Sequence, residues 1–234
     1  TRRSSDLAIA RLAQKLCTMS VHPVWLQAYL SCRPIPLDKN PGVRPIGVCE
    51  TLRRIMGRAV LNVIGSDIQT AAGSLQLCAG QTAGIEAAIH AMRTLYDQPD
   101  TEALLLVDAT NAFNLLNRQA ALRNIRVLCP PLSQILSNCY GSGADLFVGG
   151  DVLSSREGTT QGDPLAMPMY VIGILPLIER LKSPSTHQVW YADDSTGGGK
   201  LEGVKKWWVA LNNLGPRYGY HPNAVKTWLL VKDR

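Results

Sequence analysis

The chain has 234 residues, 46% of them apolar and 18% charged, with a formal net charge of +6. These values predict a soluble globular protein with a sizeable core. No run approaches the ~20 apolar residues of a membrane span, so no membrane partner is expected. Six cysteines without C-x-x-C spacing argue against a zinc site or a disulfide framework. They suit a reducing, intracellular compartment, whether nucleus or cytoplasm.

Positive charge is concentrated near the N-terminus. Residues 1–60 contain ten Lys or Arg against three Asp or Glu, whereas residues 61–234 contain fourteen against fifteen. This asymmetry is typical of a protein that binds a nucleic-acid backbone with one part and carries out chemistry with another. A predicted helix over residues 51–68 also contributes, because three of its arginines are expected on a solvated face. They are Arg53, Arg54 and Arg58, opposite an apolar stripe of Leu52, Ile55, Met56, Val60 and Val63.

Two short strands joined by a turn are predicted over residues 35–48. Asn40-Pro41-Gly42 places Pro second and Gly third in the turn, which is the type II signature. Lys39 and Arg44 would lie near the tip, where two cations on a flexible hairpin suit a triphosphate. A plain charged loop is the local alternative.

A buried strand that ends in a carboxylate is predicted next. Residues 103–107 form a continuous apolar run, and Asp108 follows it. A carboxylate in that position costs free energy unless a cation or a donor compensates it. Asn114 or Asn117 lies closer to the start of the next helix, so Asp108 is not needed as a cap. A metal ligand is the better interpretation.

A polar loop at residues 158–163 precedes a predicted helix over residues 165–181. Asp163-Pro164 has the pattern of a helix start, with Asp at the N-cap and Pro in the first turn, so Asp163 is expected to be structural. Gln161 and Gly162 would then lie at a helix N-terminus. Free N–H groups and the helix dipole there suit a phosphate or a nucleotide edge.

Two adjacent carboxylates, Asp193 and Asp194, follow Tyr191-Ala192 and precede three glycines at residues 197–199. Neighbouring side chains on a strand point to opposite faces, so this pair converges only where the chain bends. The glycines are expected to give the backbone freedom for a tight hairpin. A hairpin tip with two carboxylates suits Mg²⁺ near phosphate, and a solvated turn is the alternative.

Together these segments resemble a reverse transcriptase, most closely the polymerase domain of non-LTR (LINE-like) retrotransposons. The resemblance covers about residues 35–231. A single motif of this kind is weak, whereas five in the family's order are specific. The order is the basic hairpin, Asp108-x4-Phe113, Gln161-Gly162-Asp163-Pro164-Leu165, Tyr191-Ala192-Asp193-Asp194 and Gly219-x3-Asn223-x2-Lys226.

The resemblance implies a metal site. Asp108, Asp193 and Asp194 would hold two Mg²⁺ ions, with Mn²⁺ possible, and the carbonyl of Ala109 would add an oxygen. Two such ions activate the primer 3′-hydroxyl and stabilise the departing pyrophosphate.

Further residues acquire substrate roles from the same resemblance. Lys39 and Arg44 would contact the incoming dNTP. Gln161 and Gly162 would pack against that nucleotide and the template base. Lys226 is the candidate for contacting and protonating the leaving pyrophosphate, although a lysine at the end of a strand is usually just solvated.

Phe113 would select the sugar, because the family places a bulky ring beneath the deoxyribose five residues after the first Asp. Such a ring leaves no room for a 2′-hydroxyl, which favours DNA precursors. A core aromatic is the alternative, but polar Asn111 and Asn114 flank Phe113 and favour the sugar gate.

The implied fold is α+β: polymerase fingers and a ferredoxin-like palm, an antiparallel sheet backed by helices, with the thumb absent. Residues 1–100 would be mainly fingers and residues 101–234 mainly palm, in one continuous unit. The expected partners are an RNA template, a DNA primer, dNTPs, and the missing thumb and other domains of a parent polyprotein.

Two other interpretations stay open at this level. One is a reverse transcriptase of another lineage, such as a group II intron or retron type, or an RNA-dependent RNA polymerase. The other is a non-catalytic RNA-binding relic of a reverse transcriptase, although such relics typically lose the carboxylates that this chain keeps.

Overall fold

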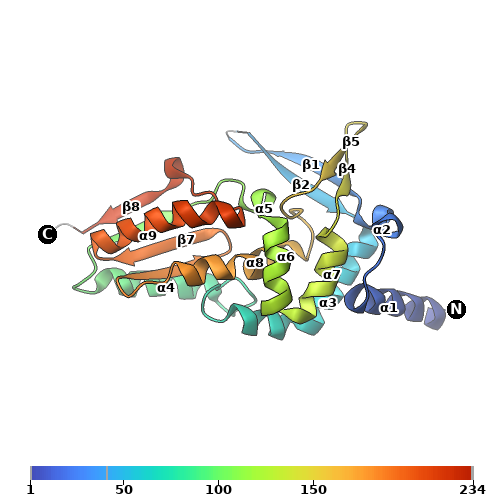
Figure 1. Ribbon diagram of the computed structural model, residues 1–234, viewed down its shortest axis with the longest axis horizontal. Helices are drawn as coiled ribbons and strands as arrows, with labels where there is room; N and C mark the ends of the chain where they lie inside the picture. The colour runs from blue at the N-terminus through green and yellow to red at the C-terminus, as the bar shows by residue number, and fades with distance from the viewer. Residues whose placement is uncertain (1, 41, 233–234) are drawn as a thin grey trace.

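A computed structural model describes residues 2–40 and 42–232 of the chain. Two four-stranded sheets lie on either side of a group of packed helices, with α1 and β8 at opposite ends of the molecule (Figure 1). No helix in the described ranges is both long and apolar enough to cross a bilayer.

The first sheet has the strand order β2-β1-β4-β5. Its two hairpins are each antiparallel, and they meet where Cys32 of β1 runs parallel to Leu146 of β4. Residues from both sides of position 100 therefore build this sheet. Its strands are β1 (Cys32–Asp38), β2 (Val43–Cys49), β4 (Ala144–Val148) and β5 (Asp151–Ser155).

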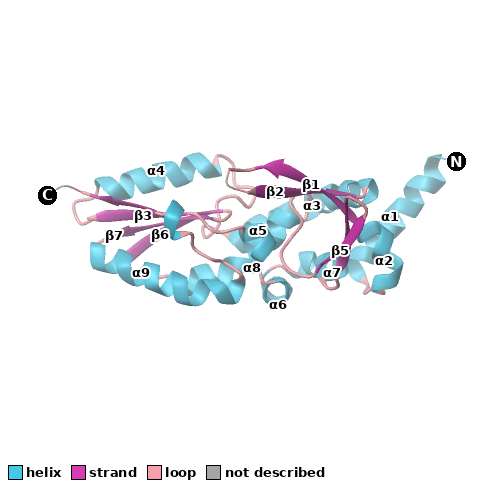
Figure 2. Cartoon of the chain, turned by 90° about the horizontal axis from the view of Figure 1, so that it is seen from above, coloured by secondary structure: helices cyan, strands magenta, loops and turns pink. Residues whose placement is uncertain are grey.

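The second sheet has the strand order β6-β7-β3-β8, with every pair antiparallel. Two helices cover its opposite faces (Figure 2). A Cβ on Gly198 would meet Leu95 of one helix, and a Cβ on Gly197 would meet Trp207 of the other. The strands are β3 (Ala103–Val107), β6 (Thr186–Tyr191), β7 (Asp194–Gly199) and β8 (Trp228–Val231), and the helices are α4 (Gly84–Asp97) and α9 (Leu201–Leu214).

The remaining helices lie between and beside the sheets. The central one, α8, is buried on nearly all sides, which agrees with its almost wholly apolar sequence. One hydrophobic cluster extends from Leu16 through α8 to Tyr220, so the described chain shares one core. These helices are α1 (Arg2–Thr18), α2 (Pro23–Leu30), α3 (Thr51–Ala72), α5 (Ala112–Leu115), α6 (Arg118–Leu128), α7 (Pro130–Tyr140), α8 (Ala166–Arg180), η1 (Gly215–Tyr218) and η2 (Ala224–Lys226).

The buried face of α3 differs from the predicted one. Arg53 was expected in solvent, yet it is 1% exposed and paired with Asp163. Ile55 and Val63 were expected in the core, yet they are 57% and 78% exposed. The apolar periodicity alone could not place the arginine, because its partner is distant in sequence. The inward face carries Arg53, Met56, Gly57, Val60, Ile64, Ile68 and Ala72.

Candidate active site

Asp108, Asp193 and Asp194 come together at one end of the second sheet. Val107, the last residue of β3, is opposite Ser195 of β7, so Asp108 and Asp194 lie at adjoining ends of neighbouring strands. The carboxyls of Asp193 and Asp194 both experience the negative charge of Asp108. The fold thus brings the three carboxylates to the same end of the second sheet.

Burial and repulsion from neighbouring carboxylates disfavour ionisation of Asp193 and Asp194. Burial raises the pKa of Asp193, and the nearby Asp108 raises it further, while a backbone hydrogen bond, Arg44 and Lys39 lower it. Burial also raises the pKa of Asp194, with further contributions from Asp193 and Asp108. A cation bound among the three would relieve this repulsion.

The donor chemistry fits Mg²⁺, since hard carboxylate oxygens are the ligands that this ion takes from proteins. Within residues 2–40 and 42–232, however, no group of three or more His, Cys, Asp or Glu side chains is arranged to hold a metal ion. An ammonium also lies close to one of these carboxylates, since Lys226 Nζ is 3.5 Å from Asp108 Oδ2. The metal site remains a prediction, with these carboxylates as the candidate ligands.

The predicted tight hairpin is present at Asp193 and Asp194, but glycine does not supply its bend. Strand β6 ends at Tyr191 and β7 begins at Asp194, so Ala192 and Asp193 form the turn. Ala192 has φ +52°, the left-handed region that disfavours a residue with a Cβ. The three glycines lie within β7 and not at the bend. They are needed there for close packing, since a Cβ on Gly197 would lie 2.7 Å from Trp207.

Lys226 reaches Asp108 because the segment around η2 is hydrogen-bonded to the end of β3. Asn223 N donates to Asp108 O at 2.8 Å, and Thr110 N donates to His221 O at 2.8 Å. The Asn223 side chain also accepts from Val225 N and so caps the short helix that carries Lys226. Ala109 lies between these bonds, in a bridge with Pro222.

The β1–β2 hairpin carries the two predicted cations, Lys39 and Arg44. Arg44 is opposite Leu37 in the strand register, and Lys39 N donates to Gly42 O at 3.0 Å. Both cations lower the pKa of Asp193, so they lie within electrostatic range of it. The predicted type II turn includes Pro41, which lies outside the described residues.

Gln161 and Gly162 lie against strand β2. Gly47 N donates to Gln161 O at 2.6 Å. Gly162 has φ +108°, and a Cβ on it would lie 2.5 Å from Gly47 O, so only glycine fits this contact. Gln161 also lines a cavity of about 400 Å³ between the two hairpins of the first sheet.

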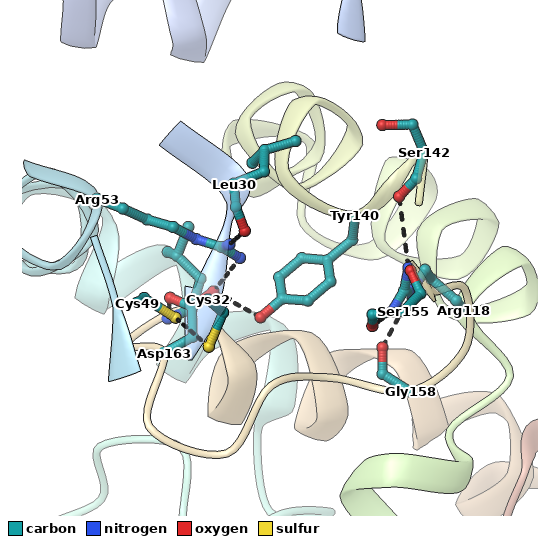
Figure 3. A network of polar contacts seen from close by, with 11 residues as sticks. Leu30, Cys32, Cys49, Arg53, Arg118, Tyr140, Ser142, Ser155, Gly158 and Asp163 are labelled. Carbon is teal, nitrogen blue, oxygen red and sulfur yellow. Dashed lines mark hydrogen bonds and ion pairs between the residues drawn. The ribbon is translucent and has the colours of Figure 1, made fainter. Parts of the chain in front are cut away.

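Asp163 is structural, as expected, but it is not the N-cap. Helix α8 begins at Ala166 with Leu165 as its N-cap, and Asp163 Oδ1 accepts from Leu165 N in the preceding turn. Its other oxygen accepts from Arg53 and from Tyr140, each at 2.5 Å (Figure 3).

The network of polar contacts around Asp163 also includes residues of α2, β5 and the loop after β5. Arg53 also donates to Leu30 O, and Arg118 donates to the carbonyls of Ser155 and Gly158 (Figure 3). The ring of Tyr140 lies 5.3 Å from the Arg53 guanidinium and 5.4 Å from that of Arg118. These contacts fix the loop that carries Gln161 and Gly162 relative to α3, α6 and α7.

Phe113 stacks on Tyr170 of α8, with ring centroids 4.6 Å apart and planes inclined by 25°. It is only partly buried and packs against the core. Tyr170 is fully buried, and burial and then the neighbouring Tyr220 and Asp193 raise its pKa well above the usual value. Phe113 therefore stacks on a buried ring that lies within electrostatic range of Asp193, while its own role as a sugar gate stays a prediction.

Two buried polar residues that contact the carboxylate turn were missed by the sequence analysis. Gln76 bonds both backbone polar groups of Ala192, and Tyr220 donates its hydroxyl to Asp193 O at 2.9 Å. Gln76 lies in a connecting segment without any motif. Tyr220 lies within the last motif, where its apolar ring gave no reason to expect this bond.

No protein-family model matches the chain, and no curated protein was found to match it. Solved structures match in fold. Telomerase from Candida albicans, in complex with a fragment of telomeric RNA, aligns over 87% of this chain at 11% identity, with a TM-score of 0.67. Apo telomerase from Candida tropicalis aligns over 98% at 13% identity, with a TM-score of 0.68. This chain spans 42% and 49% of the length of those two chains.

These likenesses establish the architecture. Telomerase is a reverse transcriptase, so the chain has a reverse-transcriptase-like fold with polymerase fingers and palm. The predicted fold class, antiparallel sheets backed by helices, is confirmed. The likeness does not distinguish a retrotransposon lineage from other reverse transcriptases.

Proposed function

We propose that this chain is the RNA-directed DNA polymerase core of a non-LTR (LINE-like) retroelement, which adds dNTPs to a primer 3′-hydroxyl on an RNA template. The observation that carries the proposal is the meeting of Asp108, Asp193 and Asp194 within range of the cations Lys39 and Arg44. The reverse-transcriptase-like fold supports the polymerase reaction. The order of the five motifs supports the lineage.

Asp108, Asp193 and Asp194, with the Ala109 carbonyl, would hold two Mg²⁺ ions. When bound, such ions activate the primer hydroxyl and stabilise negative charge on the departing pyrophosphate. Asp193 and Asp194 suit this task because a bound cation would relieve the repulsion that each experiences from Asp108.

The cationic residues would act on the triphosphate. Lys39 and Arg44 lie on the hairpin that faces Asp193, so they would bind the phosphates of the incoming dNTP. Lys226 lies beside Asp108, where its ammonium would donate a proton to the leaving pyrophosphate.

The nucleotide itself would contact Phe113, Gln161 and Gly162. The tight contact between Gly162 and strand β2 holds the loop in one position, which favours a fixed shape for the base pair. The Phe113 ring, supported by Tyr170, would exclude a ribose 2′-hydroxyl.

Primer extension on an RNA template with a DNA primer and Mg²⁺ or Mn²⁺ tests the proposal. Wild type should extend the primer with dNTPs, Asp193→Asn should lose at least about 10³-fold in rate, and Asp97→Asn, on an exposed carboxylate of α4, should not. Preferred use of rNTPs would point to an RNA polymerase. RNA binding without extension, unchanged in Asp193→Asn, would identify a non-catalytic relic.

A further inference from the structure

The turn between β6 and β7 is held by a side chain from a distant segment. Gln76 Oε1 accepts from Ala192 N at 3.0 Å, and Gln76 Nε2 donates to Ala192 O at 2.7 Å. The side chain amide thus satisfies both backbone polar groups of a single residue, as a paired strand would. Gln76 is fully buried, so water does not compete for these bonds.

Ala192, the residue that Gln76 hydrogen-bonds, has a strained backbone conformation. Ala192 is the turn residue at φ +52°, a conformation that an alanine leaves unless its surroundings fix it. It directly precedes Asp193. A relaxation at Ala192 would therefore rotate the backbone that aims both carboxylates.

Neighbouring contacts reinforce this hold from two sides. Leu77 N donates to Trp190 O at 3.0 Å, and Cys78 Sγ lies 3.1 Å from Ala192 N. On the other side Tyr220 donates to Asp193 O, and its hydroxyl lies 3.0 Å from Ser195 Oγ. The turn is thereby fixed between residues 76–78 and Tyr220.

We propose that Gln76 is a positioning residue that locks the Ala192–Asp193 turn, so that Asp193 and Asp194 stay aimed at Asp108. The catalytic consequence rests on the polymerase function proposed above, whereas the lock on the turn is independent of it. Glutamine suits the position because it presents one donor and one acceptor at the reach required. Asparagine is shorter, and glutamate lacks the donor when ionised.

The test compares Gln76→Met with a matched control, Gln81→Met, in the complete chain. Methionine keeps the length and volume of glutamine but makes neither hydrogen bond. Gln81 lies in the same connecting segment and bonds Gly73 O and Gln69, away from the turn. Should Gln76→Met fail to fold, Gln76→Asn answers the same question, because its side-chain amide is too short to reach both backbone groups of Ala192.

The first readout is amide hydrogen exchange in a peptide spanning residues 190–195, which needs no activity. Exchange should become about tenfold faster in Gln76→Met and stay unchanged in Gln81→Met. An unchanged exchange rate in Gln76→Met would contradict the proposal that Gln76 holds the Ala192–Asp193 turn.

The second readout is primer-extension kinetics. The value of kcat should fall about 10- to 100-fold in Gln76→Met, while KM for dNTP and Kd for the template–primer stay within about twofold. Faster amide exchange with an unchanged kcat in Gln76→Met would contradict the role of Gln76 in positioning the carboxylates for catalysis. If wild type itself does not extend primers, the proposed function fails, and the exchange measurement still decides whether Gln76 holds the turn.

Discussion

Lys226 Nζ lies 3.5 Å from Asp108 Oδ2, with both side chains partly exposed. The ammonium therefore places a positive charge beside one of the three carboxylates at the candidate site. An exposed pair of this kind contributes little to stability. Because the Lys226–Asp108 pair lies at the candidate metal site, we expect it to affect catalysis more than stability.

Replacing Lys226 with Gln should lower kcat without weakening metal binding. If the ammonium protonates the leaving pyrophosphate, the rate should fall about 100-fold. The concentration of Mg²⁺ needed for half-maximal rate should stay the same or decrease, since a competing cation has gone. Lys205→Gln, on an exposed position of α9, is the control. A rate equal to wild type would show that Lys226 is merely solvated.

Phe113→Val should relax sugar discrimination. The smaller side chain leaves room for a 2′-hydroxyl, so the ratio of kcat/KM for rNTP to that for dNTP should rise about 100-fold, equivalent to about 2.7 kcal/mol. Competition between dCTP and CTP at a single template position measures it. Tyr170→Phe keeps the supporting ring and serves as the control. A variant with unchanged discrimination would leave Phe113 as a core aromatic.

The buried Arg53–Asp163 pair should dominate the stability of the junction between the first sheet and α8. Arg53→Met leaves a buried carboxylate with Tyr140 as its remaining side-chain donor, so the free energy of unfolding should fall by about 3–5 kcal/mol. Urea unfolding measures this loss. In contrast, Lys182→Met breaks an exposed pair with Glu179 and should change stability by less than about 1 kcal/mol. Equal losses of stability in Arg53→Met and Lys182→Met would contradict the large contribution assigned to the buried pair.

Stability without metal should depend on pH through Asp193 and Asp194. Both have a pKa raised in the folded state, so protonation favours folding. Their favourable contribution is complete below the unfolded-state pKa and disappears as pH rises through the folded-state pKa. The double variant Asp193→Asn, Asp194→Asn should therefore gain stability over wild type as pH rises across that window. Urea unfolding at a series of pH values measures this, and a constant difference would contradict it.

Local sequence signals predicted much of the fold. The Asn117 side chain accepts from Ala120 N and caps α6, as its position before that helix indicates. Gly149 and Gly150 both have positive φ at the turn between β4 and β5, where two adjacent glycines suit a tight hairpin. Runs of apolar residues likewise placed β3 and α8.

Contacts between distant segments could not be predicted in this way. Arg53 is paired with Asp163, and Ala192 at the bend is hydrogen-bonded to Gln76, each partner being more than a hundred residues away. Periodicity therefore assigned Arg53 to solvent, and turn propensity assigned the bend to glycines that instead lie within β7, where Gly197 packs against Trp207. A single sequence carries no signal for such pairs.

Binding of Mn²⁺ by the chain, with template–primer and a non-incorporable dNTP present, tests the metal site most directly. Electron paramagnetic resonance of free Mn²⁺ gives the number of ions bound. Saturable binding is predicted for wild type and for Asp97→Asn, with at least a tenfold loss of affinity, about 1.4 kcal/mol, in Asp108→Asn and in Asp193→Asn. Equal Mn²⁺ binding by all four proteins would contradict the assignment of these carboxylates as metal ligands.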